Sequence, residues 1–225
     1  MTWVKLCGNA HEEDVALCVE AGADAVGVVV EYPLPVPWTV DRARAAALLA
    51  AVPAGVDRVA VVGGDAETLV ALAEATRPTA LQLHLDEPEA VVEAVATRLA
   101  GSGTRLIRAL RVDVESPDAD AHALVEVARR LHDAGADEIL LDARTRARPA
   151  GTGVPIDRTL ARAVAAAAPC PVILAGGLDA ASVGAAIAAV RPHGVDVISG
   201  VEGPGHRKDP GRTRAFVAAA RAARG

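Results

Sequence analysis

Hydrophobic residues along the chain fall into two alternating kinds of segment. Short runs rich in valine, isoleucine and leucine occupy residues 3–7, 23–30, 57–63, 79–84, 104–110, 137–142, 171–176 and 194–199. Longer alanine- and leucine-rich segments separate them, and their apolar residues recur at helical spacing. Gly22 and Gly135 stand where helices of this pattern would end, as glycines commonly do. The pattern therefore predicts eight strands that alternate with helices.

Continuous apolar strands separated by helices indicate a parallel sheet that helices cover. Eight such units within 225 residues favour a single (β/α)8 barrel, the TIM barrel, over an open sheet. A doubly wound sheet is the alternative fold. No linker or shift in composition marks a second domain, so we expect one domain over residues 1–225.

Composition and charge exclude several classes of protein. Hydrophobic residues make up 52% of the chain, far more than a disordered protein contains. No apolar run reaches the roughly 18 residues of a membrane span, and the first residues lack a signal-peptide pattern. A net charge of −6 and only 2% aromatic residues argue against nucleic-acid binding. Three cysteines without paired or metal-type spacing fit a reducing compartment. We expect a cytoplasmic protein without metal, membrane or nucleic-acid partners.

Glycines gather after the last predicted strands, at the end of the barrel where such enzymes carry their sites. Without side chains they let backbone N–H groups approach a phosphate, and barrels often bind phosphate after strands seven and eight. The alternative is that they only permit tight turns. The expected phosphate-binding residues are Gly151, Gly153, Gly176, Gly177, Ser199 and Gly200.

Two strand ends carry side chains suited to acid–base chemistry. Alternation along the first predicted strand puts Lys5 and Cys7 on one face, and the apolar outer face of a barrel strand implies that they point inward. Asp142 shares the inward face of the sixth strand with Leu140. A lone cysteine is more often a buried hydrophobe, which is our interpretation of Cys18 and Cys170.

Several motifs, in order along nearly the whole chain, carry a resemblance to a known family. They read VKLCGN, AGADAVGVVV, LQLH, LLDARTR, AGTG, VILAGGL and VDVISGVEGPGHRKD. In these motifs the chain resembles the phosphoribosylanthranilate isomerases, barrel enzymes of tryptophan biosynthesis. The longest stretch of similarity runs over residues 171–209.

The resemblance implies an Amadori rearrangement of an N-(5-phosphoribosyl) aromatic amine to a 1-amino-1-deoxyribulose 5-phosphate. It implies that Cys7 is the base, Asp142 the acid, and that neither metal nor organic cofactor takes part. Trp38, His84 and Arg108 are expected to line the pocket for the aromatic half. A phosphosugar is then the only partner, and the chain is a monomer or a homodimer. The chemistry needs a raised pKa at the acid and a lowered one at the base, the latter through a nearby cation such as Lys5.

One segment departs from the family pattern. After the second strand the family carries an arginine that holds the substrate's aromatic carboxylate, whereas this chain has Trp38 near that position and Glu31 upstream. Either Arg144, Arg146 or Arg148 compensates, or the substrate is a related N-glycoside without the carboxylate. A non-catalytic barrel that binds phosphosugars is a third possibility.

Overall fold

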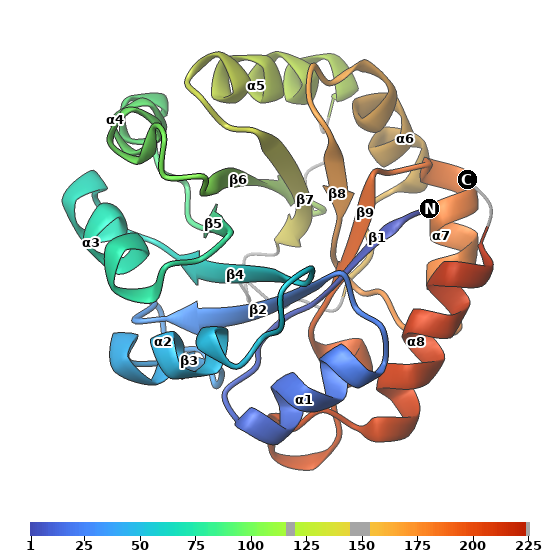
Figure 1. The fold of residues 1–225 in the computed structure, drawn as a ribbon. Coiled ribbons are helices and arrows are strands. Elements are labelled where there is room, and N and C mark those ends of the chain that lie inside the picture. Colours follow the sequence, from blue (N-terminus) through green and yellow to red (C-terminus); the bar gives the residue numbers. More distant parts are fainter. Residues whose placement is uncertain (116–119, 145–153, 224–225) are drawn as a thin grey trace.

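The computed structural model describes residues 1–115, 120–144 and 154–223, and in this part of the chain eight parallel strands close into a barrel (Figure 1). The strands follow the order β1-β9-β8-β7-β6-β5-β4-β2, and pairing of β1 with β2 closes the ring. Their bounds are β1 (Trp3–Leu6), β2 (Ala25–Val30), β4 (Asp57–Val62), β5 (Ala80–Leu83), β6 (Arg105–Asp113), β7 (Glu138–Arg144), β8 (Val172–Leu174) and β9 (Gly194–Val197). The predicted TIM barrel is confirmed.

Helices surround the barrel on its outside (Figure 1). They are α1 (Glu12–Glu20), α2 (Arg42–Ala50), α3 (Ala66–Thr76), α4 (Glu89–Leu99), α5 (Ala121–Asp133), α6 (Arg158–Ala167), α7 (Val183–Val190) and α8 (Pro210–Ala222). Asp41, Asp65, Asp157 and Asp209 cap four of them, because each side chain accepts a hydrogen bond from a backbone N–H three residues ahead. Gly22 (φ 86°) and Gly135 (φ 105°) follow α1 and α5 in left-handed conformation, as expected.

Alternation along the strands divides the buried hydrophobic residues into two clusters. The larger lies between the sheet and the helices and includes Leu6, Val26 and Leu81. The smaller fills the inside of the barrel and includes Val59, Ile107 and Leu140. No helix among the described residues has the length and apolar character needed to cross a membrane.

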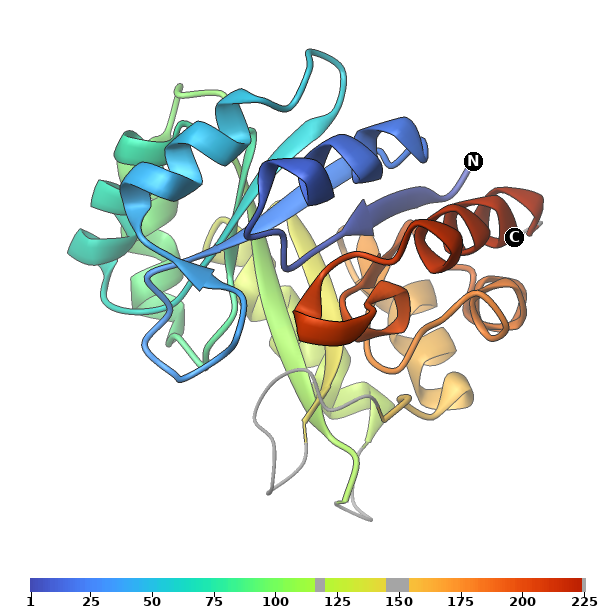
Figure 2. The same ribbon diagram turned by 90° about the horizontal axis from the view of Figure 1, so that it is seen from below.

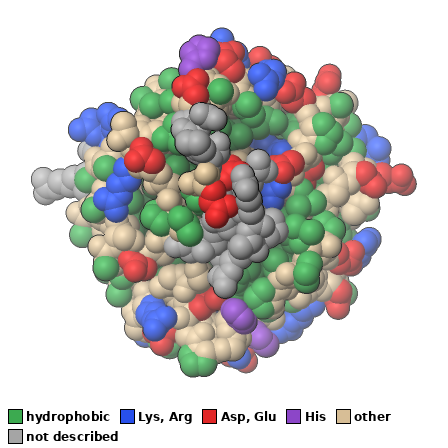
Figure 3. Space-filling view, turned by 180° about the vertical axis from the view of Figure 1, so that it is seen from behind, with side chains coloured by type: hydrophobic (Ala, Val, Ile, Leu, Met, Phe, Trp, Pro, Cys, Tyr) green, Lys and Arg blue, Asp and Glu red, His purple; other side chains and the backbone are tan. Residues whose placement is uncertain are grey.

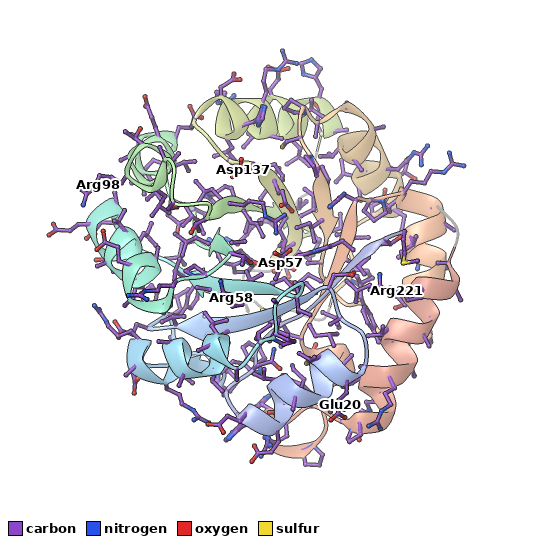
Figure 4. All side chains as sticks on the ribbon, in the orientation of Figure 1. Glu20, Asp57, Arg58, Arg98, Asp137 and Arg221 are labelled. Carbon is purple, nitrogen blue, oxygen red and sulfur yellow. The ribbon has the colours of Figure 1, made fainter. Side chains whose placement is uncertain are left out.

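Polar side chains close the end of the barrel where the strands begin. Arg105 donates to Asp57 and Glu138, each at 2.6 Å, and the Trp3 indole donates to Asp57 at 3.2 Å. All four residues start strands, and Figure 4 shows Asp57 toward the middle of the ring. A ligand must therefore enter from the opposite end, toward which β6 and β7 run in Figure 2.

Three short elements complete that opposite end. The two-residue strand β3 (Thr39–Val40) pairs with the end of β2 and was not predicted. The 3-10 turns η1 (Ser199–Val201) and η2 (Pro204–His206) lead from β9 into α8. All three lie at the carboxyl ends of the strands, where the candidate site is found.

Candidate active site

A cavity of about 680 Å³, part of it open to solvent, lies at the carboxyl ends of the strands. Acidic side chains gather near the centre of the face opposite to that seen in Figure 1 (Figure 3). The residues that line the cavity are Cys7, Val29, Tyr32, Val36, Trp38, Val61, Gln82, His84, Asp142, Ala175, Gly176, Gly177, Leu178, Asp196, Val197, Ile198 and Ser199.

Cys7 follows β1 directly and is 2% exposed. Gly27 on the neighbouring strand makes room for it, since a Cβ there would lie 2.6 Å from the Cys7 sulfur. Lys5 lies two residues before Cys7 on the same face of the strand and is fully buried. Its Nζ lies 3.0 Å from Oδ1 of Asp196. Burial raises the pKa of the Cys7 thiol, and Lys5 opposes this rise only in part because Asp196 acts in the same direction as burial. Without substrate the pKa is therefore not lowered as the chemistry would need.

Asp142 lies near the end of β7 with its carboxylate in the same cavity. Its Oδ1 accepts a hydrogen bond from the backbone N–H of Ala143 at 2.9 Å, and its Oδ2 lies 3.4 Å from Nε2 of His84. The side chain is nearly buried, at 8% exposure for the residue. Cys7 and Asp142 thus face one shared space from two different strands.

His84 belongs to the cavity, and it brings with it a residue that the sequence did not single out. Gln82 lies two residues earlier on the inward face of β5, and its Nε2 is 3.0 Å from Nδ1 of His84. Tyr32 donates a hydrogen bond to the His84 carbonyl at 2.7 Å. The period-two pattern around His84 was the available signal for Gln82.

The glycines after β8 have a backbone geometry that residues with a Cβ rarely adopt, and the turn after β9 packs closely against them. Gly176 and Gly177 have φ of 87° and 63°. A Cβ on Gly200 would lie 2.0 Å from the carbonyl oxygen of Leu178, so the two turns touch each other. Gly176, Gly177 and Ser199 line the cavity. Gly151, Gly153, Arg146 and Arg148 lie outside the described residues, as does the side chain of Arg144.

Trp38 is buried and lines the cavity, held by a contact with the turn before α8. Its indole N–H donates to Oε1 of Glu202 at 2.6 Å, and its ring meets the His206 ring edge-on with centroids 5.8 Å apart. The same Glu202 oxygen also accepts from the buried Lys208 at 3.3 Å. The indole N–H is thus already engaged, and the ring forms an apolar wall.

Two charged residues from the sequence prediction face away from the cavity. Arg108 pairs in register with Leu83 on the outer face of the sheet, and its guanidinium binds the Glu87 carbonyl at 2.9 Å and carboxylate at 3.5 Å. The expected place of Arg108 in the aromatic pocket is therefore not supported. Glu31 binds Arg42 at the start of α2, and these hydrogen bonds lower the pKa of its carboxyl to about 2. Among the described residues lining the cavity there is neither an arginine nor a lysine.

Comparison with known proteins places the chain in a family. The family model for N-(5'-phosphoribosyl)anthranilate (PRA) isomerase matches residues 4–219. The chain belongs to this isomerase family. The N-(5'-phosphoribosyl)anthranilate isomerase of Afipia carboxidovorans is 42% identical over 98% of this chain and 89% of its own length. The sequence resemblance to the isomerase family is confirmed, and with it the assignment of the chain as an enzyme.

Solved structures of phosphoribosylanthranilate isomerase share the whole fold. The enzyme from Thermotoga maritima superposes with a TM-score of 0.82 at 31% identity, covering 98% of this chain and 99% of that one. A second isomerase structure, in complex with reduced 1-(o-carboxyphenylamino)-1-deoxyribulose 5-phosphate, gives a TM-score of 0.79 at 30% identity with the same coverage. No three His, Cys, Asp or Glu side chains in the described part of the chain lie together as a metal site requires.

Proposed function

We propose that this chain isomerises N-(5'-phosphoribosyl)anthranilate to 1-(o-carboxyphenylamino)-1-deoxyribulose 5-phosphate, with Asp142 as general acid and Cys7 as general base. The observation that carries the proposal is the position of these two side chains in one cavity of a barrel that matches the isomerase family over nearly its full length. A binding protein without catalysis would have no use for an acid and a base in the same cavity.

The reaction begins with opening of the sugar ring. Asp142 transfers its proton to the furanose ring oxygen, the bond from C1 to that oxygen breaks, and the substrate nitrogen takes up the positive charge as an iminium. Asp142 is only 8% exposed, so little water separates its carboxyl group from the ring oxygen of a bound substrate. The substrate nitrogen is the electron sink, so the step needs no cofactor.

The second step removes the proton from C2. The iminium acidifies this proton, and the thiolate of Cys7 takes it, which leaves an enolamine that tautomerises to the ketone. Burial raises the pKa of the Cys7 thiol, while the Lys5 ammonium favours the thiolate. The thiol gives its proton to solvent as the thiolate forms. The positive iminium next to Cys7 adds to the effect of Lys5, so the base is stabilised when the substrate has opened.

The two halves of the substrate would occupy different walls of the cavity. We assign the phosphate to the turns of Gly176, Gly177 and Ser199, whose backbone can approach an anion closely. The aromatic ring fits the apolar wall that Trp38 and Val36 form on the other side. The similarity to isomerases named for the anthranilate substrate favours that substrate over a different N-glycoside.

We place the enzyme in the cytoplasm, as a monomer or a homodimer. All three cysteines are free thiols, and Cys7 must stay reduced to act as a base, which a reducing compartment ensures. Size-exclusion chromatography with light scattering decides the oligomeric state.

The proposal is tested by incubating the purified chain with N-(5'-phosphoribosyl)anthranilate and following substrate and product by chromatography. Turnover without added metal, together with rescue of a tryptophan auxotroph that lacks the isomerase, would support it. Binding of the substrate without conversion would leave a phosphosugar-binding protein, and the proposal would be wrong.

A further inference from the structure

The imidazole of His84 has charged or polar partners at both ring nitrogens, although the reaction as described does not use it. Nε2 lies 3.4 Å from Oδ2 of Asp142, and Nδ1 lies 3.0 Å from the amide of Gln82. The side chains of His84 and Asp142 are only 12% and 11% exposed. The three side chains form a chain from the inside of the barrel to the general acid.

We propose that His84 is a positioning residue that holds the proton which Asp142 delivers to the substrate, with Gln82 orienting its ring. The proposal rests on the proposed function. An isolated aspartic acid has a pKa of about 3.9 and would be ionised at neutral pH, whereas a histidine near 6.5 keeps a proton far more often. A carboxylate beside an imidazolium shares one proton with it, so the acid is recharged at once after each turnover.

The proton transfer balances without any other reagent. The proposed cycle starts with a proton on Nε2 of His84, which faces Oδ2 of Asp142. As substrate excludes water, the N–H bond breaks and an O–H bond forms on Oδ2, which leaves a neutral imidazole and a carboxylic acid. Asp142 then gives this proton to the ring oxygen. When product leaves, solvent reprotonates His84, which is partly exposed at the mouth, and the Cys7 thiol returns to solvent the proton that it took from C2.

The side-chain amide of Gln82 offers Nδ1 of His84 both a hydrogen-bond donor, its nitrogen, and an acceptor, its oxygen. The imidazolium has a proton on Nδ1 that requires an acceptor, and the Oε1 of Gln82 is buried without a hydrogen-bond partner among the described residues. A half-turn of the amide places Oε1 on Nδ1 instead of Nε2, and the two orientations have the same shape. Gln82 is 1% exposed, so water does not replace it there.

Other groups around His84 do not compete for its ring. The Tyr32 hydroxyl binds the backbone carbonyl of His84, and Arg111 binds Asp86 at 2.5 Å. Glu87 faces Arg108 on the outer side of the sheet. Among the described residues, the titratable or charged groups in the surroundings are Cys7, Tyr32, Asp86, Glu87, Arg108, Arg111, Asp142 and Asp196. Asp142 is the acid in contact with an imidazole nitrogen.

The test is the pH dependence of kcat for His84→Asn against the wild-type enzyme. We expect the alkaline limb of the profile to move toward acid by at least about one pH unit, so kcat falls roughly tenfold more near pH 8 than near pH 6. Tyr32→Phe is the matched control, because it loosens the same backbone without touching the ring nitrogens and should leave the limb in place. An equal loss of kcat at every pH in His84→Asn would overturn the proposal.

A second measurement does not depend on that variant. Nitrogen-15 NMR of His84 in the wild-type protein and in Asp142→Asn reports directly which ring nitrogens have a proton, and we expect removal of the carboxylate to reduce the protonated fraction of Nε2 at neutral pH. An unchanged protonated fraction would also overturn the proposal. Absence of turnover in the wild-type enzyme would instead refute the proposed function, so the two failures are distinct.

Discussion

The buried pair of Lys5 and Asp196 is open to a sharp test through Asp196→Asn. Lys5 is 0% and Asp196 6% exposed, and their charged atoms lie 3.0 Å apart. Loss of one partner from such a pair leaves a charge that is buried without compensation, which typically costs about 3–5 kcal/mol of unfolding free energy. Asparagine keeps one oxygen for the Lys5 ammonium, so we expect about 3 kcal/mol, the lower end of that range.

The destabilisation should depend on pH through Cys7. In the wild-type protein burial raises the pKa of the thiol above its unfolded value, so the stability linked to the neutral thiol is present below about pH 8.5 and is lost as pH rises. Without Asp196 one cause of the raised pKa is gone and the thiolate becomes the partner of Lys5. The difference in unfolding free energy between the wild-type protein and Asp196→Asn should therefore become smaller between about pH 6 and pH 9.

Urea unfolding of both proteins at several pH values measures the effect, with equal m-values as the condition for comparison. Glu12→Gln is a control for loss of an exposed ion pair, since Glu12 binds Arg44 at the surface, and should leave the midpoint unchanged. The double change Lys5→Met and Asp196→Leu should recover most of the stability. A loss below about 1 kcal/mol in Asp196→Asn, or a deficit that grows with pH, would refute the reasoning.

Three further predictions concern the substrate. No arginine or lysine lines the described part of the cavity. The kcat/KM for an analogue that lacks the aromatic carboxylate should therefore be within about tenfold of the value for the anthranilate substrate. A preference of about a hundredfold for the carboxylated substrate would show that a cation binds the carboxylate. Gly177→Asp should raise KM for the phosphorylated substrate at least about tenfold, and inorganic phosphate should inhibit the wild-type enzyme competitively. Trp38→Phe removes the hydrogen bond to the buried Glu202 and should lower Tm and raise KM with little change in kcat, as steady-state kinetics and thermal unfolding would report.

The fold was predictable because periodicity places every strand of a barrel. The ends of the strands were less predictable, since they depend on the turns that follow and on pairing with adjacent strands. The end of the seventh predicted strand shows one cause: residues 171–176 were expected as strand, but β8 stops at Leu174 because Gly176 takes a φ of 87°. By contrast β6 runs on to Asp113, since it pairs with β7 as far as Arg144.

Alternation was enough to find Cys7 and Asp142, the proposed base and acid, and the same rule shows why Arg108 was misplaced. Ile107 and Ala109 belong to the inner cluster, so the residue between them faces the helices. Arg108 was assigned to the pocket because it is a charged residue near a strand end, although the period-two pattern already placed its side chain on the outer face of the sheet. Glu202 could not be found in this way, because its contact with Trp38 joins residues 164 positions apart in the sequence.

The central claim is that Cys7 and Asp142 are the base and acid of one isomerisation, and kcat of Cys7→Ala and Asp142→Asn on N-(5'-phosphoribosyl)anthranilate tests it most directly. Both side chains line the cavity and neither belongs to the hydrophobic core between sheet and helices, so circular dichroism and Tm should show folded proteins. We predict that each change lowers kcat by at least about 10², the usual contribution of a general acid or base. Near-normal kcat in either folded variant would contradict the account.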